Sequence, residues 1–225
     1  MIRLQRWGGR PPRDDELLEI DPDGTFRMRR TVGPATRPAT PVGRFGGMLP
    51  AASRKALADL AARLEDAPAE RNPLPMDASV DELTVDGAGG TAAGPAGIAF
   101  SGAWGELAQV LRGMLVDLAA HPLAAIALAS SDEGLRLEHL GLEGLDLVVN
   151  ELVVHVGSTA PPAHVPGAAI SGGSSGGAFQ ARPGWTVRLP LALPAAPATI
   201  IRVEGILVGD GTLWRPAVLE LQRPG

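Results

Sequence analysis

The feature that most constrains the fold of this chain is an apolar stripe between Ala103 and Ala120. Its members step by three and four residues, which places them on one side of a 3.6-residue helix. They are Trp104, Leu107, Ala108, Leu111, Leu115 and Leu118. The sequence therefore predicts a core helix over about residues 103–120, with an apolar side on which strands can pack.

The ends and the interior of this helix carry further signals. Ser101 suits the N-cap, and His121-Pro122 ends the helix because a residue before proline is steered away from the α region. Gly113 lies inside it and costs about 1 kcal/mol relative to alanine. That cost indicates close packing at Gly113.

A second amphipathic helix is predicted over about residues 50–65. Pro50 suits the first turn of a helix. The apolar stripe of this helix comprises Leu57, Leu60, Ala61 and Leu64. Since neither helix is long, both need a sheet to pack against.

The first fifty residues carry strand signals. Ile2–Trp7 alternates apolar and polar residues, as a half-buried strand does. The turn sequence Asp21-Pro22-Asp23-Gly24 separates 17–20 from 25–30 and predicts a β-hairpin. Residues 42–49 form another short strand candidate, and 82–85 a further one. Residues 87–97 are too rich in glycine and alanine to assign.

After residue 122 the chain changes character and no further helix is evident. Six segments have the composition of strands: 123–129, 135–140, 145–156, 186–193, 199–208 and 213–221. Residues 145–156 are apolar on both faces for part of their length, which predicts a central strand. Residues 158–183 hold many prolines and glycines, which predicts a long Gly/Ser/Pro loop.

These patterns predict an α+β fold. Residues 1–121 form a portion with a short-stranded sheet and two amphipathic helices, at about 50–65 and 103–120. Residues 122–225 form a β-rich portion, antiparallel and sandwich-like, with the loop at 158–183.

Composition excludes several classes of function. The formal net charge of −5 argues against general affinity for nucleic acid, which needs a basic surface. The absence of cysteine excludes disulfides and thiolate metal sites. No run of apolar residues resembles a signal peptide or a membrane span. These absences lead us to expect a cytoplasmic protein. Lys55 is the lone lysine beside many arginines, which is typical of a GC-rich bacterium.

The string Gly172–Gly177 holds the most suggestive chemical motif. It contains G-x-S-x-G twice, with Ser174 or Ser175 as the candidate nucleophile of a hydrolase. It is also similar to the glycine-serine signature of the amidase family, which uses a lysine as base. A nucleophile elbow needs a strand before the serine and a helix after it, and neither is predicted here. A flexible loop explains the string better.

Other residue types that carry chemistry are scattered. The four histidines, His121, His139, His155 and His164, lack the spacing of paired metal ligands. No phosphate-binding glycine loop is present. We therefore expect no metal and no cofactor.

Arginines crowd the first fifty residues. Arg27, Arg29 and Arg30 lie on the second strand of the predicted hairpin and make a candidate basic face for an anionic partner. Ordinary solvated strands are the alternative interpretation.

The N-terminal region of about 65 residues resembles the emfourin family of protealysin inhibitors. The likeness is carried by Gly8-Gly9, by Arg29-Arg30 and by the helical sequence LPAASRKALADLAARL. That family lacks a long β-rich C-terminal half. The resemblance implies a binding protein that blocks or engages a metalloprotease, without assigning inhibitory residues.

The sequence favours a non-catalytic protein-binding or assembly module over an enzyme. We expect its partner to be another protein, with no nucleic acid and no membrane involved, and a homo-oligomer stays open. The alternative is a hydrolase whose serine nucleophile lies in Gly172–Gly177.

Overall fold

The computed structural model describes residues 1–9, 14–32, 40–65, 67–69, 71–75, 77–88, 90–96, 100–131, 134–157, 161–171, 177–191, 199–211 and 213–222. Of the described residues, 54% lie in strands and 18% in helices, and neighbouring strands pair antiparallel. The predicted α+β class is therefore wrong. Several stretches that were predicted as loops or left unassigned form paired strands. The helices hold a much smaller share of the described residues.

The chain divides into two compact units. The first comprises Met1–Arg29 and Phe45–His121, and the second comprises Arg30–Arg44 and Pro122–Gly225. The second unit thus takes a segment from inside the N-terminal region, which no feature of the sequence indicated.

The first unit is built on one sheet and two helices. Its strands are β1 (Ile2–Gly8), β2 (Asp14–Ile20), β3 (Thr25–Arg30), β4 (Val42–Met48), β5 (Ser79–Val85) and β6 (Thr91–Pro95), of which β3 ends and β4 begins in the second unit. Its helices are α1 (Ala51–Ala62) and α2 (Gly102–Leu118). The strand order is β4-β3-β2-β1-β5-β6. Both helices lie where the sequence predicted them, as do β1 and the β2–β3 hairpin.

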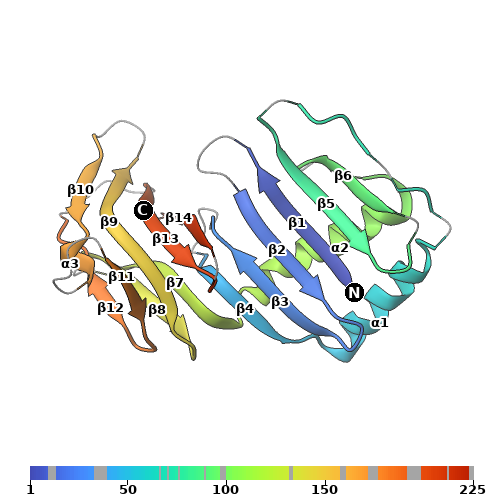
Figure 1. The fold of residues 1–225 in the computed structure, drawn as a ribbon, viewed down its shortest axis with the longest axis horizontal. Coiled ribbons are helices and arrows are strands. Elements are labelled where there is room, and N and C mark those ends of the chain that lie inside the picture. Colours follow the sequence, from blue (N-terminus) through green and yellow to red (C-terminus); the bar gives the residue numbers. More distant parts are fainter. Residues whose placement is uncertain are drawn as a thin grey trace. The chain divides into compact units, whose positions relative to one another are not determined.

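Strand alternation supplies the apolar face that the helices cover. Leu4 of β1 lies between its register partners Leu18 of β2 and Leu83 of β5, and all three are buried. All six residues of the predicted α2 stripe are buried too. In Figure 1, α2 passes behind β1, β2 and β3. The core of this unit therefore lies between α2 and one face of the sheet.

This unit differs from the sequence analysis at three places. The strand predicted over 17–20 begins earlier, at Asp14, and β6 forms in the unassigned stretch 87–97. A Cβ added to Gly113 would meet nothing within 4 Å. Close packing does not explain this glycine, since its position on α2 is open.

The second unit holds most of the remaining strands. They are β7 (Pro122–Ser131), β8 (Gly134–Gly141), β9 (Leu145–Val156), β10 (Ala163–Pro166), β11 (Ala178–Ala181), β12 (Thr186–Arg188), β13 (Ile200–Gly209) and β14 (Trp214–Gln222), with the short helix α3 (Ala168–Ser171). One sheet has the order β12-β8-β7, and the other has the order β10-β9-β13-β14 with β11 also pairing with β9. As predicted, β9 is an interior strand. Side chains of both sheets join in one apolar core.

The predicted loop at 158–183 is only partly a loop. Its described residues contain β10 and β11, both antiparallel to β9, and also α3, although no helix was expected after residue 122. Each of these elements has four residues, too few for a periodic pattern to reveal. The predicted strand at 186–193 is likewise only β12, three residues long.

A β-bulge shapes the centre of the second sheet. The register of β13 shifts between Val203 and Ile206 against β14, and close by against β9. Gly205 lies in this shift with φ +92°, and a Cβ there would sit 2.0 Å from the carbonyl oxygen of Glu151. Only glycine fits this backbone without displacing β9.

Candidate binding surface

The sheet of the first unit has a second face, which we call the open face because no described helix of that unit covers it. Alternation along β1 places Arg3, Gln5 and Trp7 there, out of phase with the buried Ile2 and Leu4. The cross-strand partners of Arg3 and Trp7 on β2 are Glu19 and Asp15. Directly opposite residues in an antiparallel pair share a face. The open face is therefore lined by side chains of both charges and one tryptophan.

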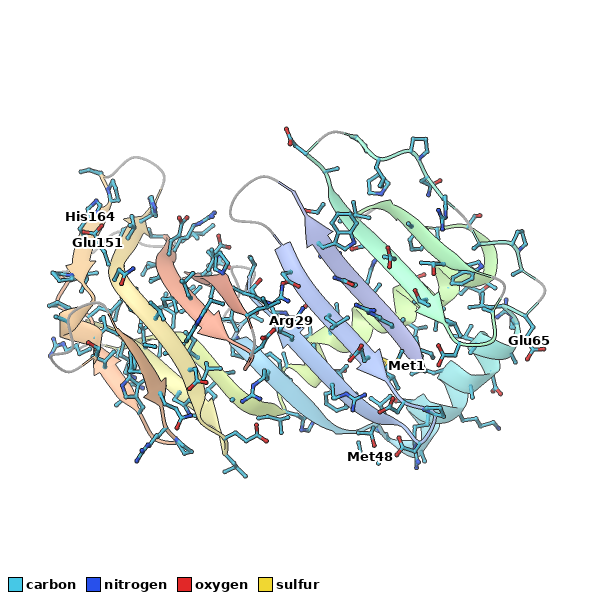
Figure 2. The ribbon with its side chains drawn as sticks, in the orientation of Figure 1. Met1, Arg29, Met48, Glu65, Glu151 and His164 are labelled. Carbon is cyan, nitrogen blue, oxygen red and sulfur yellow. The ribbon has the colours of Figure 1, made fainter. Side chains whose placement is uncertain are left out.

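Ion pairs join three arginines of the open face to neighbouring carboxylates. Arg29, labelled in Figure 2, donates from Nη2 to Oδ1 of Asp15 at 3.1 Å. Arg27 pairs with Asp21 at 3.1 Å and lies 3.9 Å from Glu19, which is also 4.0 Å from Arg3. Each guanidinium is thus held beside an opposite charge, which restrains its side chain.

The candidate basic face is divided by the alternation of β3. Arg27 and Arg29 contact carboxylates of the open face, whereas Arg30 is buried with 5% of its surface exposed. The structure does not bring the three arginines together on one surface, and Arg27 and Arg29 are locally balanced by acidic side chains. A role of these residues in binding stays a prediction.

Trp7 is a residue of this face that the sequence analysis did not propose for binding. It is 43% exposed, although a large aromatic side chain gains most from burial. The signal was present in the sequence, because the alternation Ile2–Leu4 places Trp7 on the opposite, polar side of β1.

The covered face holds a buried carboxylate that the sequence did not single out. Asp81 of β5 is 1% exposed and accepts hydrogen bonds from Nε of Arg6 at 2.7 Å and Nη2 of Arg112 at 2.6 Å. Burial alone would raise the pKa of Asp81, but the hydrogen bond and the charge of Arg6, with those of Arg112, lower it below its ordinary value. We call Asp81, Arg6 and Arg112 the triad. Because Arg112 belongs to α2, the triad links that helix to β1 and β5 by ion pairs.

The histidines do not gather into a site. His139 of β8 is 6% exposed, and neither of its ring nitrogens has a hydrogen-bond partner in the part of the chain that the structure describes. Desolvation lowers the pKa of His139, opposed by a weaker interaction with the Glu143 backbone that falls short of hydrogen-bond geometry. His164 pairs through Nδ1 with Glu151 at 3.2 Å, and both side chains, labelled in Figure 2, are exposed. Among the described residues, no three potential metal ligands converge.

The serine candidates cannot be placed in this geometry. Ser174 and Ser175 lie outside the described residues, as does most of the Gly172–Gly177 string. The hydrolase alternative therefore stays a prediction from sequence. Labelling with a fluorophosphonate probe, repeated on Ser174→Ala and Ser175→Ala, addresses it directly.

Comparisons with known proteins add no relative to this picture. None of the described helices combines the length and the apolar character that crossing a membrane requires. No family model, curated protein or solved structure matches the chain.

Proposed function

We propose that this protein is a non-catalytic binding protein and that the open face of its first unit meets a partner protein. The observation that carries the proposal is the exposed Trp7 beside arginines that ion pairs hold in place. Tryptophan and arginine dominate the few residues that supply most of the energy of protein interfaces.

The ion pairs favour binding in a second way. An arginine that is free in solution loses side-chain entropy when a partner fixes it, at a cost of about 0.5–1.5 kcal/mol. Arg29 is already held by Asp15, and Arg27 by Asp21. These side chains lose less freedom on contact, so the face is ordered for binding in advance.

The resemblance to the emfourin family suggests a metalloprotease as the partner. The order of elements supports this suggestion: β1 ends in Gly8 and Gly9, both with positive φ, and the arginine-bearing β3 precedes β4 and α1. We therefore take a metalloprotease of the protealysin type as the first partner to test.

The test measures binding of the full-length protein to such a protease by calorimetry, together with inhibition of peptide cleavage. We expect Trp7→Ala to weaken binding about 30-fold, as loss of a central interface residue does. Trp214→Ala is the matched control, because Trp214 of the second unit is 46% exposed. Equal affinities of all three proteins would remove the open face as the binding surface. Absence of any binding would remove this protease class as the partner.

A further inference from the structure

The first unit contains a cavity of about 330 Å³ between α1 and the ends of three strands. Its floor is apolar. Ile2 of β1 lies between its register partners Ile20 of β2 and Val85 of β5, and Leu57 of α1 faces the same space. All four side chains are buried in the unit, so the floor is part of the packed core.

Small side chains keep the cavity open. The wall on α1 is formed by Ala58, Ala61 and Ala62, and two turns, 21–24 and 86–88, close its sides. A larger aliphatic residue at any of the three alanine positions would extend into the space. The volume lies at the small end of the range of ligand pockets, about 300–1,000 Å³.

The charged groups around the cavity are mostly satisfied. Asp21 pairs with Arg27 at 3.1 Å, and Asp86 pairs with the amino group of Met1 at 3.0 Å. Arg54 donates from Nη1 to the carbonyl oxygen of Asp23 at 3.0 Å. Glu65, which follows α1 and also lines the cavity, has no ion pair or side-chain hydrogen bond within the described residues. Figure 2 labels Met1 and Glu65, which both border this space.

We propose that this cavity is a binding site for a small apolar molecule that carries one ammonium group. The apolar body of the ligand packs on Ile2, Ile20 and Val85, where it is removed from water. Its cation faces Glu65, the rim carboxylate for which the described residues provide no ion pair or side-chain hydrogen bond. This site is separate from the open face, so it does not depend on the proposed protein partner.

The experiment uses three probes that share one apolar body and differ in charge: 3-phenylpropylamine, 3-phenylpropanol and 3-phenylpropanoate. Each is titrated into the full-length, ¹⁵N-labelled protein at pH 7, and amide shifts give the site and the dissociation constant. We expect shifts at 20–24, 57–65 and 85–88. We expect the amine to bind about two- to fivefold more tightly than the alcohol, the range of a solvent-exposed ion pair, and the carboxylate to bind most weakly.

Two substitutions separate the apolar and the charged contributions. Glu65→Gln makes the amine and the alcohol equal in affinity, whereas Asp59→Asn, on α1 but outside the cavity, leaves the preference intact. Ala61→Leu fills the cavity and weakens all three probes at least tenfold, whereas Ala52→Leu, at an exposed position of α1 outside the lining, does not. Ala58→Leu repeats the filling at a second position in case Ala61→Leu does not fold.

Three results overturn the proposal: shifts that map elsewhere, a preference for the carboxylate probe, or affinities that both filling variants leave unchanged. A preference for the amine that survives Glu65→Gln also overturns it, because another group would then bind the cation.

Discussion

Asp81 of the first unit and His139 of the second unit are both buried, but their surroundings differ. Asp81 is 1% exposed, and two arginines satisfy it. His139 is 6% exposed, and within the described residues both of its ring nitrogens lack a hydrogen-bond partner. Burial disfavours the charged form of both side chains. Only Asp81 has charged neighbours that outweigh burial, so its pKa is lowered and it stays ionised, whereas burial lowers the pKa of His139 and keeps it neutral.

The difference shows that burial of a polar side chain does not by itself indicate stabilisation. Asp81 contributes because it is charged and paired, so removing it leaves two arginines uncompensated. His139 costs free energy because desolvated nitrogens lose their bonds to water. Replacing Asp81 and replacing His139 should therefore change stability in opposite directions.

The largest expected effect is at Asp81. Asp81→Asn should lower the free energy of unfolding by about 3 kcal/mol, the low end for a broken buried ion pair, because both arginines reach solvent in part. Urea denaturation measures the loss, and hydrogen exchange should locate it in α2, β1 and β5. Asp117→Asn, at an exposed position of α2, is the control and should change little.

The pH dependence of the same variant sharpens this result. The pKa of Asp81 in the folded protein lies below its ordinary value near 3.8, so the unfolded chain binds more protons in that range. The stability that Asp81 contributes is full above about pH 4 and is lost as pH falls through the folded-state pKa. Asp81→Asn should remove this part of the acid sensitivity. An unchanged acid profile would show that the triad does not contribute.

A steric effect comes next, in the second unit. Gly205→Ala should destabilise the protein by about 2 kcal/mol, because its Cβ would sit 2.0 Å from the Glu151 carbonyl oxygen at a positive φ. Gly211→Ala also has a positive φ but no atom within 4 Å of the new Cβ. It should cost about 1 kcal/mol from backbone strain alone. Equal losses in thermal unfolding would remove the steric argument for the bulge.

The opposite sign is expected at His139. His139→Leu should raise the free energy of unfolding by about 1 kcal/mol at pH 7, since it removes two unsatisfied nitrogens. Below the ordinary pKa of 6.5 the unfolded chain takes up a proton that the folded protein resists, so wild-type stability falls as pH drops. The gain of the variant should therefore grow between pH 7 and pH 5. If His139→Leu is less stable than the wild type at both pH values, His139 stabilises the protein as Asp81 does, and the contrast between the two residues is wrong.

The smallest effect is expected on α2. Gly113→Ala should raise the free energy of unfolding by about 0.8 kcal/mol, because the position is open and alanine is the better helix former. Gly105→Ala on the same helix should destabilise it, since its Cβ would lie 2.1 Å from the Phe100 carbonyl oxygen. Thermal unfolding of the two variants should show shifts of opposite sign.

What the sequence predicted well depended on long local patterns. The α2 stripe repeats a helical period over about four turns, the hairpin has a strong turn sequence at Asp21–Gly24, and β9 is a long segment that is apolar on both faces for part of its length. The elements β6, β10 and β11 were missed because they have only four or five residues each, too few for a periodic pattern to reveal. The fold class was wrong because strands hold 54% of the described residues and helices only 18%.

The candidate site was less predictable than the fold. The sequence identified Arg27 and Arg29 but not their partners Asp21 and Asp15, since cross-strand register depends on the whole sheet. Alternation along β3 places Arg30 on the side opposite Arg27 and Arg29, but its burial could not be predicted, because it depends on what packs against that side. Asp81 and Arg112 are 31 residues apart, and only the packing of α2 on the sheet brings them together.

The segment Arg30–Arg44 has a consequence for biosynthesis. It leaves the ribosome early, yet it belongs to a unit whose other residues begin at Pro122. Val42, fully buried in the finished protein, must wait for partners made eighty or more residues later. A nascent chain halted after His121 would leave β4 paired with β3 alone, and the open edge of β4 is a site where chains associate wrongly. Cutting the gene at that point should therefore yield an aggregating fragment rather than a free domain.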